Sequence, residues 1–336
     1  MLNWRRLSLL AAISSTIYLV ACSSGTPPAA ENSQPTNQPA AMATHGGSSG
    51  HGKININTAI LSELDKLEAK LGVPALSHKI QSNRPYVNPE ELVSKKVISQ
   101  EQYDQIKDLV TIEDIVLTGE AKDIDYMIKL GLMKGHMMVA KELLDLGKPD
   151  QAEPHIGHPV EEIYVDIEEQ LAERGVPDFK EGLLRLQDLV KGKPNDPAVA
   201  TEFAASMAAI DKAIAALPES QRQSPSFVLQ VINGLLDTAT AEYTAAISNG
   251  KIAAAIEYQD SRGFVLYAQD TLYPMIGDKM TGENAAASAK IKSTLADLAT
   301  AWPAPLPPET LVMTAEEVAA KVKQIGQNSQ GVIAAK

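Results

Sequence analysis

Imidazole and carboxylate side chains at helical spacings are the groups of this chain best suited to chemistry. His155 and His158 stand three residues apart, and Glu162 follows one helical turn after His158. Imidazole nitrogens and carboxylate oxygens that project into a helical bundle are common ligands of transition metal ions. The pattern predicts a transition metal site without indicating which ion. The candidate ligands are His136, His155, His158, Glu162, Glu257 and Asp260.

A structural use of the same residues is the alternative. His136 has apolar residues three and four positions away on both sides, and a buried histidine with one hydrogen bond is a common core residue. His155 and His158 could simply form hydrogen bonds at the start of a helix. The methionines near His136 could suit Cu(I) or could fill an irregular core. They are Met127, Met133, Met137 and Met138.

Two neighbouring helices must position the histidines. Helical periodicity covers about residues 122–146, with His136 near the middle. We expect the next helix over residues 159–175, because it would start with a proline, so that His155 and His158 lie in the loop before it. The short link predicts that the two helices pack against each other and that this loop folds inward toward His136.

Helix-boundary residues organise the rest of the chain. Further helices are expected at about 177–191, 197–216, 225–249, 251–272, 283–301 and 315–325, with the last ten residues fraying. Pro197 and Pro225 suit the first turn of their helices, Gly147 suits the position after a helix end, and Thr314 opens a capping-box pattern. Because Asn249-Gly250 is a turn sequence, the helices on either side of it should be antiparallel neighbours.

The fold class predicted from these patterns is all-α. Aromatic residues make up only 4% of the chain, and the helical part lacks the alternation of a strand. We expect a small helical module at 53–114, followed by a larger antiparallel helical bundle at 120–280. Residues 281–336 should add C-terminal helices and a Pro-rich segment that pack on the bundle.

The module resembles the helix-hairpin-helix domains of the competence protein ComEA and of the photosystem II extrinsic protein PsbU. The resemblance rests on Ile54-Asn55-Ile56-Asn57-Thr58-Ala59, Leu61, Leu64, Leu67, Gly72-Val73-Pro74, Arg84-Pro85-Tyr86, Pro89-Glu90-Glu91-Leu92 and Ile106-Lys107-Asp108-Leu109-Val110. It implies a helix-hairpin-helix fold. It also implies a binding role, toward DNA in the ComEA-like case and toward a protein in the PsbU-like case.

The DNA role that the resemblance implies would use backbone N–H groups of the hairpins on a phosphate. The residues concerned would be Gly72, Val73, Lys79, Lys95 and Lys96. Against it, proline replaces the second glycine of the first hairpin, the second hairpin has no glycine, and the module is more acidic than basic. DNA and an envelope protein are therefore the two candidate partners of the module.

The N-terminus resembles a bacterial lipoprotein signal. Arg5 and Arg6 precede an apolar run that closes in Leu19-Val20-Ala21-Cys22, and Cys22 is the only cysteine of the chain. The resemblance implies that residues 1–21 are a signal peptide and that Cys22 carries lipid, including palmitate. Residues 22–52 would be a lipidated, disordered tether, because they are rich in Ser, Gly and Pro. The protein would then be held on a membrane of the bacterial envelope, facing the periplasm or the cell exterior.

Net charge and the missing catalytic motifs favour a binding function. The formal net charge of −12 does not suit a chain that binds polyanions over its whole surface. Known catalytic motifs are missing from the sequence, so we expect no enzyme. The bundle is loosely similar in arrangement to the periplasmic domains of the imelysin and EfeO iron-uptake group. The leading prediction is a membrane-anchored binding lipoprotein whose module contacts DNA or a protein, and the alternative is a metal-binding accessory of iron uptake.

Overall fold

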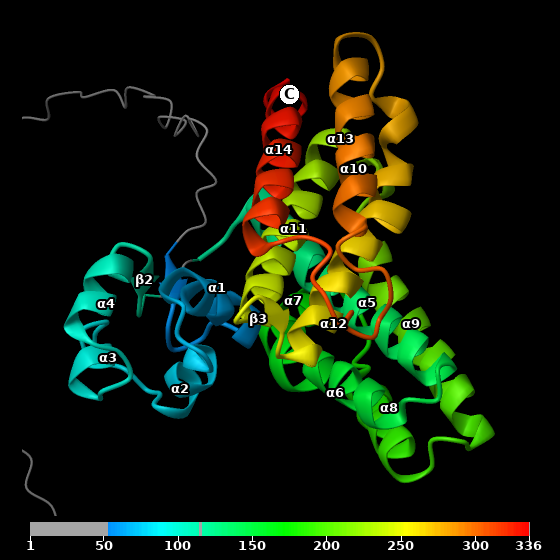
Figure 1. Ribbon diagram of the computed structural model, residues 1–336. Helices are drawn as coiled ribbons and strands as arrows, with labels where there is room; N and C mark the ends of the chain where they lie inside the picture. Colours follow the sequence, from blue (N-terminus) through cyan, green and yellow to red (C-terminus); the bar gives the residue numbers. More distant parts are fainter. Residues whose placement is uncertain (1–52, 114–115, 336) are drawn as a thin grey trace, which may run out of the picture. The chain divides into compact units, whose positions relative to one another are not determined.

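The computed structural model describes residues 53–113 and 116–335. The predicted signal peptide, the lipidated Cys22 and the tether at 22–52 lie outside the described residues. Helices dominate the described chain, and strands occur only as two very short pairs within it, so the all-α prediction is confirmed (Figure 1). No helix among the described residues has the length and apolar character needed to cross a membrane.

The module at 53–113 is built from short helices and one strand pair. Its elements are β1 (Ile54–Asn55), α1 (Leu61–Leu71), α2 (Leu76–Ser82), α3 (Glu91–Ser94), α4 (Gln100–Ile106) and β2 (Val110–Thr111). β1 and β2 pair in parallel, with Ile54 opposite Val110, which brings the two ends of the module together. The module has its own hydrophobic core, in which Leu64, Leu67 and Ile80 are fully buried.

Polar residues of the module motif hold its segments in place. Arg84 donates from Nε to the carbonyl of Ile56 at 2.8 Å and from Nη2 to that of Ala59 at 2.6 Å. The side chain of Asn57 accepts from the amide of Tyr86 at 2.7 Å and donates to its carbonyl at 2.8 Å. Buried backbone groups need such partners. These motif residues therefore have a structural role, whatever the module binds.

The bundle consists of longer helices with a few irregular turns. Its elements are α5 (Gly119–Asp145), α6 (Pro149–His158), η1 (Pro159–Ile163), α7 (Tyr164–Glu173), α8 (Lys180–Gly192), α9 (Pro197–Ala215), α10 (Glu219–Arg222), α11 (Pro225–Ala245), β3 (Ile247–Ser248), β4 (Lys251–Ile252), α12 (Ala255–Leu266), η2 (Tyr267–Leu272), η3 (Tyr273–Met275), η4 (Gly277–Lys279), η5 (Gly282–Asn284), α13 (Ala285–Ala299) and α14 (Ala315–Ala334). The predicted start signals are confirmed: Pro197 and Pro225 open their helices, and Thr314 forms the capping box. Gly147 takes the left-handed conformation just after α5.

Three boundaries differ from the sequence prediction. His155 and His158 lie within helix α6 rather than in a loop, and the chain continues past Pro159 through a π-helical turn into α7. Asn249 and Gly250 join α11 to α12 through the short antiparallel hairpin of β3 and β4. The final helix does not fray at 325 but continues to residue 334, because its apolar side chains pack on α11 and α13.

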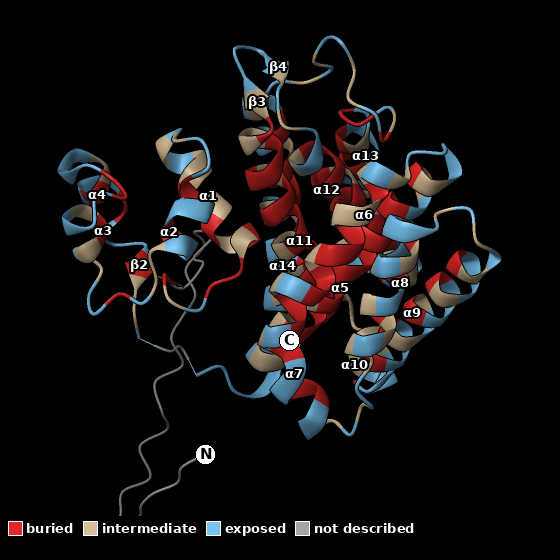
Figure 2. Cartoon of the chain, turned by 90° about the horizontal axis from the view of Figure 1, so that it is seen from below, coloured by how far each residue is buried: buried red, intermediate tan, exposed pale blue. Residues whose placement is uncertain are grey.

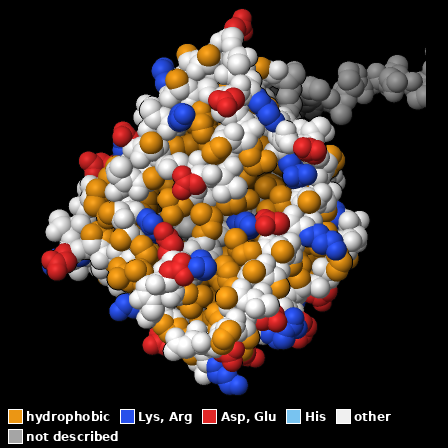
Figure 3. All heavy atoms as spheres, turned by 90° about the vertical axis from the view of Figure 1, so that its right-hand side faces the viewer, with side chains coloured by type: hydrophobic (Ala, Val, Ile, Leu, Met, Phe, Trp, Pro, Cys, Tyr) orange, Lys and Arg blue, Asp and Glu red, His pale blue; other side chains and the backbone are white. Residues whose placement is uncertain are grey.

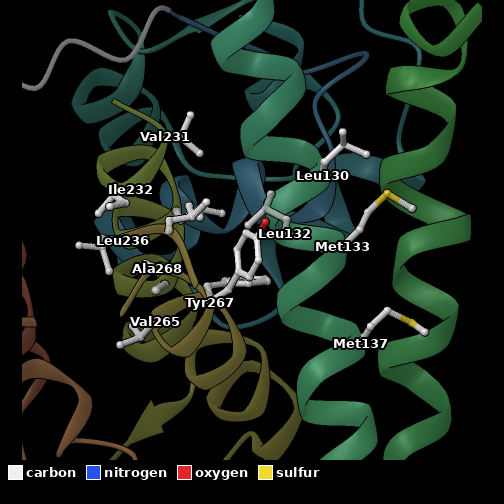
Figure 4. Packing of buried hydrophobic residues seen from close by; sticks show 14 of the residues in the cluster. Leu130, Leu132, Met133, Met137, Val231, Ile232, Leu236, Val265, Tyr267 and Ala268 are labelled. Atoms are coloured by element: carbon white, nitrogen blue, oxygen red, sulfur yellow. The ribbon is translucent and has the colours of Figure 1, made fainter. Parts of the chain in front are cut away.

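Helices α5 and α11 run through the centre of the bundle and are buried over much of their surface (Figure 2). Figure 4 shows Leu130, Met133 and Met137 of α5 and Val231 and Leu236 of α11 in this core. Because Met127, Met133 and Met137 belong to the core cluster and Met138 packs against it, the methionines near His136 fill the core.

Contacts within residues 53–335 join the module to the bundle. Helix α1 packs on α11, and Ile60, just before α1, belongs to the bundle's hydrophobic cluster. The first helix of the module is therefore part of the surroundings of the bundle residues considered below. On the face seen in Figure 3, apolar side chains lie between scattered acidic and basic ones.

Candidate metal centre

Three histidines converge on one aspartate inside the bundle. His136 Nδ1 lies 2.6 Å from Asp260 Oδ1, and His155 Nδ1 lies 2.7 Å from the same oxygen. His158 Nδ1 lies 3.3 Å from Asp260 Oδ2. One potential ligand atom from each of the four residues falls within 4.8 Å of all the others. We call His136, His155, His158 and Asp260 the His–Asp cluster.

Two glycines allow the helices of the cluster to approach closely. His136 follows Gly135 on α5, and Asp260 stands one turn before Gly263 on α12. A Cβ atom at Gly263 would lie 2.2 Å from the carbonyl oxygen of Gly135, so only glycine fits there. Arg262 of α12 also links the two helices, because its Nε and Nη2 atoms donate to the Glu142 carboxylate of α5 at 2.8 and 2.7 Å. The backbone contact explains how residues 124 positions apart share a hydrogen bond.

Helix α6 supplies the other two histidines from one face. His155 and His158 are three residues apart in a helix, a spacing that puts both side chains on the same side. Pro159 cannot donate to the carbonyl of His155, and the following turn is π-helical, with the amide of Tyr164 bonded to the carbonyl of Pro159. Such wide turns often occur at functional sites.

Gln259 fixes the orientation of His155. Its Oε1 lies 2.9 Å from His155 Nε2, while its Nε2 donates to Gln151 Oε1 at 3.0 Å and to the carbonyl of Pro305 at 3.1 Å. With its amide nitrogen committed in this way, Gln259 can only accept from His155, which therefore carries a proton on Nε2. The Nδ1 atom, which faces Asp260, is left to bind a proton or a metal ion. An imidazole ligand is commonly held by such a partner on its other nitrogen.

The Pro-rich segment contributes to this support. Trp302 is buried and donates from Nε1 to Ser261 Oγ at 2.8 Å, and the carbonyl of Ala304 accepts from the Tyr258 hydroxyl at 3.0 Å. Residues 302–305 therefore pack along α12 and carry one of the carbonyls that orient Gln259.

Burial and close charges perturb the acid–base behaviour of the cluster. Burial favours the neutral acid, but the charges of His136 and His155 and their hydrogen bonds outweigh it and hold the pKa of Asp260 well below its usual range. Burial alone would lower the pKa of His158, but the hydrogen bond and charge of Asp260 raise it to about 9. Burial lowers the pKa of His136. The buried Nε2 atom of His136 has no hydrogen-bond partner among the described residues.

The donor set fits a divalent first-row transition metal ion. Three imidazoles and one carboxylate suit Fe²⁺, Zn²⁺ and related ions, whose bonds to these atoms measure about 2.0–2.2 Å. Ligand atoms at such bond lengths lie about 3–4 Å from one another, slightly closer than the 4.8 Å limit that encloses the cluster. Small side-chain movements would complete the shell. The Nε2 atom of His136 has no hydrogen-bond partner among the described residues, whereas the Nδ1 atom of His155 would exchange its contact with Asp260 for the ion.

The structure separates the six predicted ligands into two groups. His136, His155, His158 and Asp260 come together, whereas Glu162 and Glu257 stand outside the tight cluster. Both glutamates line a pocket that also reaches His158 and Asp260, and burial raises the pKa of Glu162 to about 7. Sequence reasoning missed Gln259 and Gly263. Gly263 lies three residues after a candidate ligand, as Gly135 lies one before another, and this pairing was the available signal.

The hairpins of the module show contacts that bear on DNA binding. The carboxylate of Glu68 accepts from the amides of Ala75 at 2.8 Å and of Ser77 at 3.2 Å, so these N–H groups of the first hairpin already have an anionic partner. Lys95 donates to the carbonyls of Asn83 and Pro85 at 3.1 and 2.5 Å.

The remaining predicted DNA-contact residues lie in two different environments. Gly72 and Val73 line the pocket next to the bundle. Lys79 and Lys96 are exposed, and Lys96 takes a left-handed conformation in the second hairpin. Two exposed lysines would give a phosphate few contacts.

Comparison with protein families gives two matches. Residues 49–111 match the helix-hairpin-helix motif, which agrees with the module described above. Residues 218–336 match the iron permease-associated 4-helix bundle domain, a range that contains α11, α12, α13 and α14. Asp260 and Gln259 lie inside this range, whereas the three histidines of the His–Asp cluster lie before it. Comparison with curated proteins and with solved structures gives no match.

Proposed function

We propose that the protein binds one divalent transition metal ion at the His–Asp cluster. The single observation that carries this proposal is the convergence of three imidazoles on Asp260, with one ligand atom of each residue within 4.8 Å of the others. Around it, Gln259 leaves the Nδ1 atom of His155 for the ion. The residues would supply binding and orientation. We therefore propose a binding role for the cluster.

Iron is the metal that the comparisons favour. The matched family is described as iron permease-associated, and its range supplies Asp260 and Gln259. Three nitrogens and one oxygen also suit Fe²⁺ chemically. We therefore propose a metal-binding accessory of iron uptake, held on the envelope membrane through lipid on Cys22.

The helix-hairpin-helix module is proposed to contact protein and not DNA. Glu68 occupies amides of the first hairpin, and Lys95 is bonded within the module. The surface of α1 already packs on α11 of the same chain. These contacts support the protein alternative, in which the first partner of the module is the bundle itself.

Metal binding can be tested on the purified full-length chain in detergent. Fe²⁺ under anaerobic conditions, and Zn²⁺ in parallel, would be titrated against a coloured chelator, with bound metal counted by mass spectrometry. We expect one tight equivalent, and a loss of affinity greater than about 100-fold for Asp260→Asn and His136→Gln, because each removes a ligand atom.

The matched control for Asp260→Asn is Asp188→Asn. Asp188 is an exposed aspartate of α8 that lies outside both the His–Asp cluster and the pocket next to it, so its replacement should leave the tight equivalent unchanged. Circular dichroism would verify that each variant keeps its helices. Equal affinity of the Asp260→Asn protein and the unmodified one would disprove the proposal.

A further inference from the structure

A pocket with an acidic lining stands next to the His–Asp cluster. Its volume is 720 Å³, and it lies between α1 with its following hairpin on one side and α11, β3 and α12 on the other. The carboxylates that line it come from both parts of the chain. They are Asp65 and Glu68 of the module and Glu162, Glu242, Glu257 and Asp260 of the bundle.

Glu242 distinguishes this pocket from an ordinary acidic surface. Glu242 is only 3% exposed, and its carboxylate makes no hydrogen bond or ion pair with any residue in the described part of the chain. A buried carboxylate without a partner is costly. Glu68, by contrast, is already bonded to hairpin amides. Glu242 therefore faces the pocket with free oxygen lone pairs.

The pocket also leads to the His–Asp cluster. His158 and Asp260 line both the cluster and the pocket, whereas His136 and His155 do not reach it. The side chain of His158 is 24% exposed, while those of His136 and His155 are 2% and 0% exposed. An ion that enters from the pocket would therefore meet the His158 and Asp260 side of the cluster first.

We propose that Asp65 of the module and Glu242 of the bundle form an entrance site that binds a divalent cation through oxygen before it passes to the His–Asp cluster. The proposal rests on the proposed metal binding, which it extends with a route and a second, weaker site. Glu257 and Glu162 stand on the same lining and can add oxygen ligands, as hard cations prefer.

The electrostatics of the pair agree with this role. Burial raises the pKa of Asp65 to about 8 and raises that of Glu242 well above its usual range, and each carboxylate increases the cost of ionising its neighbours. A divalent cation would displace the protons of both carboxyl groups and neutralise the two carboxylates together. Because Asp65 belongs to α1, the ion would also bridge the module and the bundle, which gives the packing of α1 on α11 a role in metal entry.

The test uses Mn²⁺ on the full-length chain, because its electron paramagnetic resonance signal counts bound ions directly. The Asp65→Asn/Glu242→Gln double variant should lose the weaker equivalent and should load the His–Asp cluster at least about tenfold more slowly in stopped-flow mixing, since the capture step is removed. The matched control is Glu63→Gln, an acid of α1 that does not line this pocket.

The two proposals can fail separately. In His136→Gln, the weaker Mn²⁺ equivalent should persist, because the entrance site does not use this residue. If the double variant keeps both the stoichiometry and the loading rate of the unmodified protein, the entrance site is refuted while the His–Asp cluster stands. If His136→Gln changes nothing but the double variant loses all bound Mn²⁺, the His–Asp cluster is refuted and the acidic pocket alone binds the ion.

Discussion

Replacing Gly263 by alanine should damage the His–Asp cluster without touching any of its ligands. The added Cβ would lie 2.2 Å from the carbonyl oxygen of Gly135, whereas ordinary contacts start near 3.4 Å. Helices α5 and α12 would have to separate by about 1 Å. The 2.6 Å contact between His136 Nδ1 and Asp260 Oδ1 would then open to about 3.6 Å, beyond a hydrogen bond.

The expected cost has two parts. Overpacking in a close-packed interior costs roughly 1–3 kcal/mol, which corresponds to a fall in melting temperature of roughly 3–10 °C for a domain of this size. Ligand atoms that are about 1 Å too far apart cannot all reach one ion, so affinity for Fe²⁺ or Zn²⁺ should fall at least about tenfold. Both effects are measured by thermal unfolding without metal and by chelator competition.

Gly326→Ala provides the matched control. Gly326 lies inside helix α14, and a Cβ there would meet nothing within 4 Å. This variant should be more stable by roughly 0.5–1 kcal/mol, because alanine suits a helix interior better than glycine. If Gly263→Ala melts and binds metal as Gly326→Ala does, then the close crossing of α5 and α12 does not hold the cluster together.

Three further predictions concern the pocket, the anchor and the module. Burial raises the pKa of Glu242 in the folded protein above the pKa of an unfolded glutamate. The contribution of this residue to the free energy of unfolding is therefore complete below the unfolded pKa and declines as the pH rises above it. Glu242→Gln should therefore match the unmodified metal-free protein near pH 4.5 and exceed it at pH 8, by roughly 1–3 kcal/mol in urea unfolding. Equal stabilities at pH 8 would contradict this. Cys22→Ser should move the protein from the membrane pellet to the supernatant after a salt wash, because the lipid would be lost, and retention in the pellet would argue against the anchor. The full-length chain should show no salt-dependent binding to duplex DNA by fluorescence anisotropy at low salt. Binding that disappears in Lys79→Glu/Lys96→Glu would restore the DNA role.

Much of the fold could be predicted from local sequence because helix ends are local. A proline in the first turn, a Thr-x-x-Glu capping box and a glycine after the last turn each act through neighbouring backbone groups, and Pro197, Thr314 and Gly147 all behave as expected. The ends that were mispredicted depend on packing. Helix α14 continues to residue 334 because α11 and α13 cover it, and no residue near 325 carries that information.

The same distinction between local sequence and packing applies to the candidate site. The sequence by itself determined which groups can bind a metal, but it predicted a loop at His155 and His158, and the structure places both on one face of helix α6. Only the tertiary structure decided that Asp260 joins them while Glu162 and Glu257 do not, because that choice depends on the crossing of α5 and α12 at Gly135 and Gly263. The chemistry of a side chain follows from its residue type alone, whereas distances between residues more than 100 positions apart arise from the packing of whole helices.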